Sequence, residues 1–501
     1  MRAGRTYDDR VRATRRAVPA SGRTRAVAAL LAVAVGLGLV SCSSMSAPGP
    51  VPSTTAPSGT TRSVAPSAIG PSPTSVRAAT APTAPAARVE SGAESGRVAA
   101  AVRLMQTRTR AVQGRDKAAW MATVDDPRSP FGVGQARMFD NLMALPDEGF
   151  TYDAPAPAAP LSAGRARAVG PGAWVGQTQG HYELAGYDRS PRTFSVAFTF
   201  VLRPGGWRIS ADSDGVTTRQ VWDLPGMTVV RGATSLVIGN DSSARLRSFR
   251  DEADAGVVRV TAVWGPDWSS RVVLLAPATE EQFAALLHRT GDKGLDQLAA
   301  VTVGSTLAGT SAGGDRVVIN PLTYGDLGPS GRRVVVTHEL THVAARSSTT
   351  RAVPLWLSEG LADYVGYSGL DLPRARIAAP FLDRVRTAAA RRRLPTDADF
   401  DPGRAQIAPA YAAAWLACVR LADRYGQGRL VAFYRAAAGA PAAAAGPSAD
   451  GAGSPSAVPS ATGAEAGVAA ETSAAFRSVL GTTEPAFVSS WWAYAASLAR
   501  S

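Results

Sequence analysis

The sequence is poor in cysteine and histidine, with two cysteines and four histidines among 501 residues. Two cysteines cannot build a disulfide-stapled fold, so we expect the folded parts to depend on hydrophobic cores. Glycine and proline are common but follow no fixed period, which excludes a collagen-like chain. No basic stripe alternates with aromatic residues, so the net charge of +13 indicates scattered surface arginine and no nucleic-acid binding.

The first 42 residues have the layout of an export signal. A basic segment, residues 1–25, precedes the continuous apolar stretch 26–40, which is too short for a comfortable membrane span. The four residues Leu39–Cys42 resemble a bacterial lipobox, which implies cleavage before Cys42 and lipidation of its thiol. We therefore expect an exported protein held by lipid at the extracellular face of the cell membrane. An ordinary signal peptide with an incidental cysteine is the alternative.

Two stretches of low complexity divide the rest of the chain. Residues 43–95 are rich in Ser, Pro, Ala and Thr and lack an apolar period, so we predict a disordered tether. Residues 439–470 have a similar composition and predict a surface insertion between helices. The remaining length exceeds one ordinary core, so we predict two domains, 96–218 and 219–501.

The first predicted domain combines helices with a sheet. Apolar residues at helical spacing mark two helices, at 96–113 and 117–124. Strand periodicity predicts strands at 173–175, 179–184, 193–202 and 207–210. The pattern resembles the NTF2-like fold, which implies a binding or spacing module. His181 lies in one of these strands, where a structural or surface role is the expectation.

The second predicted domain is also α+β, with a small sheet and a mainly helical C-terminal part. Strands are predicted at 227–238, 270–276 and 315–320. Helices are predicted at 244–255 and 279–288, while 257–263 is either a strand or a continuation of the first helix. From Ser330 onward the pattern is helical, and His288 is expected to complement the end of its helix.

The residues with the most chemical meaning lie at 334–346, a helical segment with Ser330 as its expected N-cap. His338 and His342 are four residues apart and project from one helix face, where two imidazoles can share one Zn²⁺. Glu339 is one step round the helix, where it can take a proton from a water molecule beside the metal. Two surface histidines on an ordinary helix are the alternative.

A third ligand is predicted on the following helix, which begins near Pro354. Glu359 and Asp363 are four residues apart on it, among apolar neighbours, so a solvated acidic face is the poorer interpretation. A glutamate there completes a two-histidine, one-carboxylate site with a fourth position open. Asp363 can accept a hydrogen bond from the far nitrogen of a ligand histidine.

The segments His338–Val343 and Pro354–Tyr364 together resemble the gluzincin-type, peptidase MA-like zinc metallopeptidases, relatives of thermolysin and the zinc aminopeptidases. The resemblance implies His338, His342 and Glu359 as ligands of one Zn²⁺ and Glu339 as general base. It also implies that Asp363 accepts a hydrogen bond from a ligand histidine. A metzincin pattern fails because position 348 is Ser. No Gly-x-Met-Glu-Asn segment is present, so endopeptidase action is favoured over aminopeptidase action.

Two tyrosines are candidates for the residue that stabilises the oxyanion. Tyr411, at the start of a long helical pattern, is the first candidate, with half-buried packing as its alternative, and Tyr364 is the second candidate. Cys418 lies in an apolar run and is expected in the core, as are Trp491 and Trp492.

The function that follows is a zinc-dependent peptidase that hydrolyses peptide bonds of a protein or peptide substrate by activating water. Two alternatives remain open. One is a non-catalytic zinc-binding lipoprotein that binds a partner in the cell envelope, and the other is a zinc amidase that acts on peptidoglycan.

Overall fold

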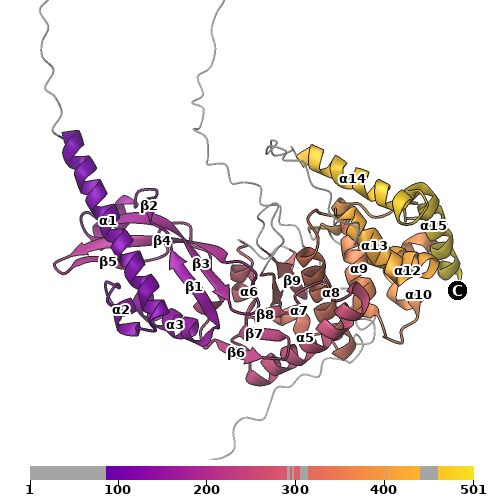
Figure 1. Ribbon diagram of the computed structural model, residues 1–501, viewed down its shortest axis with the longest axis horizontal. Helices are drawn as coiled ribbons and strands as arrows, with labels where there is room; N and C mark the ends of the chain where they lie inside the picture. Colours follow the sequence, from indigo (N-terminus) through magenta and orange to yellow (C-terminus); the bar gives the residue numbers. More distant parts are fainter. Residues whose placement is uncertain are drawn as a thin grey trace, which may run out of the picture. The chain divides into compact units, whose positions relative to one another are not determined.

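The structure is a computed structural model, and it describes residues 86–289, 294–295, 298–304, 314–401, 403–404, 406–439 and 461–501. The expected export signal, its Cys42 and most of the expected tether lie outside these residues, as does most of the insertion at 439–470. The described residues form two compact units that divide between Pro225 and Gly226 (Figure 1). No helix in the described ranges is both long and apolar enough to span a membrane.

The first unit packs helices against one antiparallel sheet (Figure 1). Its helices are α1 (Ala86–Gln113), α2 (Lys117–Met121), α3 (Pro130–Ala144), α4 (Ala163–Val169) and the short 3₁₀ helix η2 (Val221–Asp223). Its strands are β1 (Asp147–Tyr152), β2 (Ala156–Pro157), β3 (Trp174–Leu184), β4 (Arg192–Arg203) and β5 (Gly206–Ala211). The sheet order is β1-β3-β4-β5, with β2 beside β3. Aromatic rings from β1, β4 and η2 meet in its core, among them Phe150, Phe194 and Trp222.

Several elements of this unit differ from the sequence prediction. The strands predicted at 173–175 and 179–184 are one strand, β3, because its polar centre pairs with β4 along one edge and with β1 and β2 along the other. Backbone hydrogen bonds on both sides thus outweigh the interrupted apolar pattern. Helix α1 begins at Ala86, inside the segment predicted as tether, and α3, α4, β1 and β2 were not predicted.

The second unit has a five-stranded sheet in the order β6-β7-β8-β10-β9. The strands are β6 (Thr228–Arg231), β7 (Ser235–Gly239), β8 (Val272–Ala276), β9 (Ala300–Val303) and β10 (Arg316–Ile319). The three central strands are parallel, while β6 and β9 pair antiparallel at the two edges.

Helices make up most of the rest of this unit, and they are largely C-terminal to the sheet (Figure 1). Those among and directly after the strands are α5 (Ser243–Trp264), α6 (Glu280–Leu286), α7 (Pro321–Gly325), α8 (Pro329–Ser347) and α9 (Leu355–Tyr367). They are followed by α10 (Arg374–Ile377), α11 (Ala379–Arg386), the 3₁₀ helix η4 (Asp397–Phe400), α12 (Ala408–Tyr425), α13 (Gln427–Ala437), α14 (Ala461–Ser478) and α15 (Glu484–Arg500). The α+β class with a mainly helical C-terminal part is therefore confirmed.

Three local predictions in this unit need correction, and one alternative that the sequence left open, at 257–263, is decided. The strand predicted at 227–238 is a hairpin, because its Gly232–Thr234 turn is held by Asp254, which accepts from the amides of Ala233 and Thr234. The segment 257–263 continues helix α5. Helix α8 has Gly328 as N-cap in place of Ser330, since Pro329 suits the first helical position. Helix α14 begins inside the predicted insertion, at Ala461.

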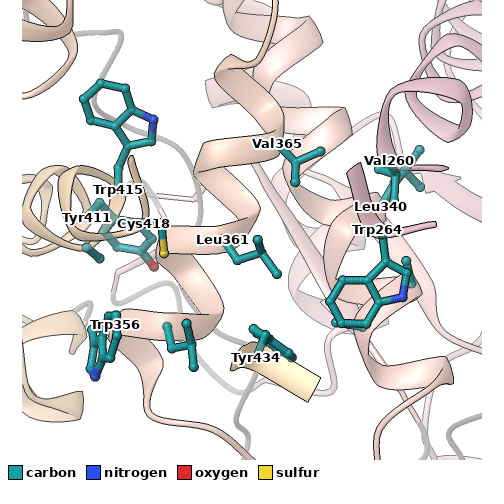
Figure 2. Packing of buried hydrophobic residues seen from close by; sticks show 14 of the residues in the cluster. Val260, Trp264, Leu340, Trp356, Leu361, Val365, Tyr411, Trp415, Cys418 and Tyr434 are labelled. Atoms are coloured by element: carbon teal, nitrogen blue, oxygen red, sulfur yellow. The ribbon is translucent and has the colours of Figure 1, made fainter. Parts of the chain in front are cut away.

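Helices α8 and α9 occupy the centre of the second unit. Helix α8 packs against α5 and α9, and α9 also packs against α12. At Gly360 the backbones of α9 and α12 approach so closely that an added Cβ would lie 2.5 Å from the carbonyl oxygen of Ala414. Figure 2 shows Tyr411 and Cys418 reaching from α12 towards α9, with Leu361 on the side of α9 facing Tyr434. Both central helices are thus held by large apolar contacts.

Candidate metal centre

Helix α8 is buried along its middle, where a soluble helix would normally show one polar face. Every residue from Val334 to Ala345 is buried, including His338 and His342, which are 0% and 4% exposed. Imidazole and carboxylate groups are rarely enclosed in this way unless they are paired or bind a metal. The enclosed polar groups therefore indicate a functional centre.

Helix α9 brings two carboxylates to the same place. Glu359 and Asp363 are 1% and 5% exposed, and they lie one helical turn apart. His338 meets both of them, with Nε2 towards Glu359 and Nδ1 towards Asp363. The packing of α8 on α9 thus converts two short motifs, separated by sixteen intervening residues, into one site.

His338, His342 and Glu359 present three donor atoms to a common point. The two Nε2 atoms are 3.0 Å apart, and Glu359 Oε2 lies 3.2 Å from the Nε2 of His338 and 3.4 Å from that of His342. Zinc bonds of about 2.0–2.1 Å in tetrahedral geometry place neighbouring ligand atoms about 3.4 Å apart. The triad therefore has the spacing and the donor types of a two-histidine, one-carboxylate zinc site, as the sequence predicted.

The outer nitrogen of each histidine has its own contact. His338 Nδ1 is 2.8 Å from Asp363 Oδ1, so the carboxylate can accept the Nδ1 proton, and Nε2 is the nitrogen that faces the site. His342 Nδ1 is 3.4 Å from the hydroxyl of Ser358. The sequence identified Asp363 from its position but gave no reason to single out Ser358.

The electrostatics of the triad favour positive charge. Burial acts to lower the pKa of His338, but the hydrogen bond and charge of Asp363, followed by those of Glu359, raise it to about 10. Burial acts to raise the pKa of Glu359, but the two histidines lower it to about 2. A buried pocket that stabilises positive charge and contains two carboxylates suits a divalent cation.

Glu339 has one engaged oxygen and one free oxygen. Thr302, on the edge strand β9, donates a 2.5 Å hydrogen bond to Glu339 Oε2. Glu339 Oε1 is buried and has no hydrogen-bond partner among the described residues. Arg346 donates to the carbonyl of Thr302 and so ties β9 to α8. Thr302 was missed in the sequence because β9 has only four residues, too few to show a strand period.

Tyr411 lies in the first turns of α12 and is buried. Its ring packs edge-on against Phe400, with 5.1 Å between centroids, and its hydroxyl has no hydrogen-bond partner among the described residues. Burial raises the pKa of Tyr411 well above its usual value, and the charges of Glu359, Asp363 and Glu339 add to the effect. The hydroxyl therefore stays protonated, as a hydrogen-bond donor, near three carboxylates.

The remaining candidates lie elsewhere. The hydroxyl of Tyr364 donates to Gln427 at 3.3 Å, so it is engaged outside the triad. His181 pairs with Asp153 at 3.0 Å in the first unit, and His288 follows α6 with a left-handed backbone. Cys418 is a fully buried free thiol that contacts the α9 backbone near Gly360, as expected for a core residue.

Comparison with known proteins adds no family to this picture. No protein-family model matches the chain, and no curated protein shows significant similarity to it. The assignment of a metal site therefore depends on the donor atoms and their spacing, which are those of a gluzincin-like zinc centre.

Proposed function

We propose that the chain is a zinc-dependent peptidase. The observation that carries the proposal is the convergence of His338, His342 and Glu359, whose donor atoms all lie within 4.8 Å of one another. Zinc bound there supplies Lewis acidity, which lowers the pKa of water towards neutrality and polarises a carbonyl group. Asp363 keeps the lone pair of His338 directed at the metal by holding the Nδ1 proton.

Glu339 is the general base in this proposal. Its free Oε1 takes a proton from the attacking water as the water oxygen bonds to the scissile carbonyl carbon. Glu339 then gives that proton to the leaving amine as the C–N bond breaks. Thr302 holds the other oxygen of the carboxylate, so the free oxygen keeps one orientation throughout.

Tyr411 is proposed to donate its unpaired hydroxyl hydrogen to the carbonyl oxygen as that oxygen becomes negative. A buried donor with no partner among the described side chains is available to bind the oxyanion as its charge develops. The high pKa of Tyr411 keeps the donor in place over the whole working pH range.

The edge of the sheet favours a peptide as the substrate. Within the described residues β9 pairs with β10 alone, so the sheet ends at this strand, where Arg346 already occupies the carbonyl of Thr302. Thr302 of this strand contacts Glu339, so an extended peptide that runs alongside β9 would pass the general base. An extended chain bound in this way suits endopeptidase action.

We further propose that the protein is exported, is lipidated at Cys42, and carries its first unit as an NTF2-like binding or spacing module. The support is the order of basic, apolar and lipobox-like segments in the sequence. Replacement of Cys42 with Ser should prevent incorporation of radiolabelled fatty acid and shift the protein out of the membrane fraction. Unchanged labelling would contradict the anchor.

The proposed activity is tested by metal analysis of the full chain together with cleavage of casein and a peptide library, with and without a chelator. We expect one zinc per chain, and cleavage that the chelator abolishes and added zinc restores. Stoichiometric zinc without peptide cleavage would contradict the peptidase proposal and support the alternative of a non-catalytic zinc-binding protein. Release of fragments from purified cell wall, without cleavage of casein or the peptides, would contradict the peptidase proposal and support the alternative of a peptidoglycan amidase.

A further inference from the structure

An arginine-lined pocket of about 300 Å³ lies in the second unit, outside the metal triad. Its walls come from the end of α11, the segment that follows it, η4 and the first turns of α12. The lining residues are Phe381, Arg384, Ala389, Ala390, Arg391, Arg393, Pro395, Asp399, Arg404, Gln406, Pro409, Ala410 and Ala413. Four guanidinium groups and one carboxylate leave three positive charges unbalanced in this concave space.

The single carboxylate, Asp399, organises part of this charge. Its Oδ2 accepts from Arg393 at 2.8 Å and from the backbone and hydroxyl of Thr396, and its Oδ1 accepts from Arg404 at 3.1 Å. Burial acts against the charge of Asp399, but the bonds from Arg393 and Thr396 outweigh it and lower its pKa to about 2. Both oxygens are already engaged, so Asp399 positions two arginines and does not neutralise the other two.

Neither of the other two arginines forms an ion pair with an acid in the part of the chain that the structure describes. Arg384 donates to the neutral side-chain oxygen of Gln406 at 3.3 Å, and no described residue pairs with the guanidinium of Arg391. The segment that carries Arg391 is ordered by its backbone, since the amides of Ala389 and Ala390 both donate to the carbonyl of Arg384. The pocket therefore presents the guanidinium of Arg391 from a segment whose backbone is held by hydrogen bonds.

The same elements also shape the metal centre. Ala410 lines the pocket and Tyr411 is the next residue of α12. Phe400, which follows Asp399 in η4, packs on the ring of Tyr411 at 5.1 Å. Asp397 of η4 accepts from the amide of Leu355, the first residue of α9. A group bound in the pocket therefore contacts α12, which carries Tyr411, and η4, which is hydrogen-bonded to the first residue of α9, the helix that carries Glu359.

We propose that this pocket is a subsite for a carboxylate side chain of the peptide substrate, which makes Arg391 a specificity-determining residue. The inference rests on the proposed peptidase function for the identity of the ligand. Guanidinium groups bind carboxylates through paired, charge-assisted hydrogen bonds, and the volume accommodates a glutamate side chain. The rival source of the same chemistry is a free oxyanion such as inorganic phosphate.

Binding is measured first, in full-length protein carrying Glu339→Gln, so that no turnover is needed. The probes are fluorescent peptides with one Glu at successive positions, each matched by a peptide with Gln there, and the readout is anisotropy. For at least one position we expect the Glu peptide to bind about 3- to 10-fold more tightly than its Gln partner at low salt. We expect this advantage to shrink as salt screens the charges.

Arg391→Gln tests the pocket itself, and Arg392→Gln is the matched control because Arg392 is a neighbouring exposed arginine that does not line the pocket. We expect Arg391→Gln to remove the preference for Glu and Arg392→Gln to retain it. Equal behaviour of the two variants, or no preference at any position, would overturn the proposal. Phosphate that loses its affinity in the Arg391→Gln protein, yet at saturation leaves the Glu preference of the Glu339→Gln protein unchanged, would also overturn it, because the free anion would then fill the pocket while the Glu side chain bound elsewhere.

Cleavage distinguishes failure of this inference from failure of the proposed function. In the protein with an intact triad, the Glu preference should enter through KM, and Arg391→Gln should reduce it. If nothing is cleaved while the Glu339→Gln protein still discriminates Glu from Gln through Arg391, the peptidase proposal fails and the carboxylate site stands. If peptides are cleaved without any such discrimination, the subsite proposal fails alone.

Discussion

The two units each bury a polar cluster, and the clusters are built in opposite ways. In the first unit Arg108 is fully buried, yet its terminal nitrogens donate to Thr123 and Gln135 and its guanidinium lies 3.4 Å from the centre of the Trp120 ring. In the second unit the triad brings three donor atoms together, and Glu339 keeps a buried oxygen without a partner among the described residues. Arg108 Nε also lacks a partner among the described residues, so the contrast lies in the other groups: the terminal nitrogens of Arg108 donate to neutral acceptors, whereas the second cluster directs three metal-ligating atoms at one point, where it could hold a metal ion.

The difference shows how a structural polar core can be told from a functional one. A cation over an aromatic face with neutral hydrogen-bond acceptors stabilises a fold. Lone pairs facing one another at 3.0–3.4 Å repel unless a cation or proton lies between them. We therefore expect substitutions in the first cluster to lower stability, and substitutions in the second to lower metal affinity or activity while the fold persists.

The largest effect is expected from Glu339→Gln. The amide keeps the shape of the side chain and loses the base, so kcat should fall by roughly 10²- to 10⁴-fold. Zinc content should remain at one per chain, as measured by metal analysis. Cleavage at the wild-type rate in this variant would remove Glu339 from the mechanism.

Arg108→Ala should lower the free energy of unfolding of the first unit by roughly 2–4 kcal/mol, because Gln135 and Thr123 lose a buried partner and Trp120 loses its packing. Chemical denaturation measures the change. Arg110→Ala, at an exposed position of the same helix, is the control and should change stability little. A stable Arg108→Ala protein would show that the guanidinium contributes nothing to the core.

Asp363→Asn should weaken zinc binding by roughly 10- to 100-fold, because an amide is a poorer acceptor for the Nδ1 proton of His338. Competition with a chelator of known affinity gives the change. At saturating zinc the variant should recover much of its activity. Unchanged affinity would mean that Asp363 does not orient its histidine.

Thr302→Val should give the smallest of these effects, a fall in kcat of roughly 10-fold, since it removes one hydrogen bond to a charged group and keeps the shape. Zinc affinity should not change, and Thr302→Ser should restore most of the rate. Equal losses in the Val and Ser variants would point to packing of β9 in place of the hydrogen bond.

The candidate metal ligands could be predicted because each motif is local. His338 and His342 are four residues apart, so any helix through them puts both on one face, and the same holds for Glu359 and Asp363. The identity of these residues and the helical pattern around them thus determined which side chains could meet. Strand β4 and parts of helices α1, α5 and α12 were predicted for the same reason, since periodicity is a property of neighbouring residues, whereas the 15-residue helix α3 was not predicted.

Only the tertiary structure decided what surrounds them. Thr302 on a four-residue edge strand, Ser358 beside His342, and the pairing of β3 on both sides depend on contacts between distant segments. The Arg391 pocket likewise forms from segments on both sides of η4. Helical spacing is a property of neighbouring residues, whereas a short strand or a pocket wall is stabilised by partners far along the chain, so its position becomes fixed only when the chain folds.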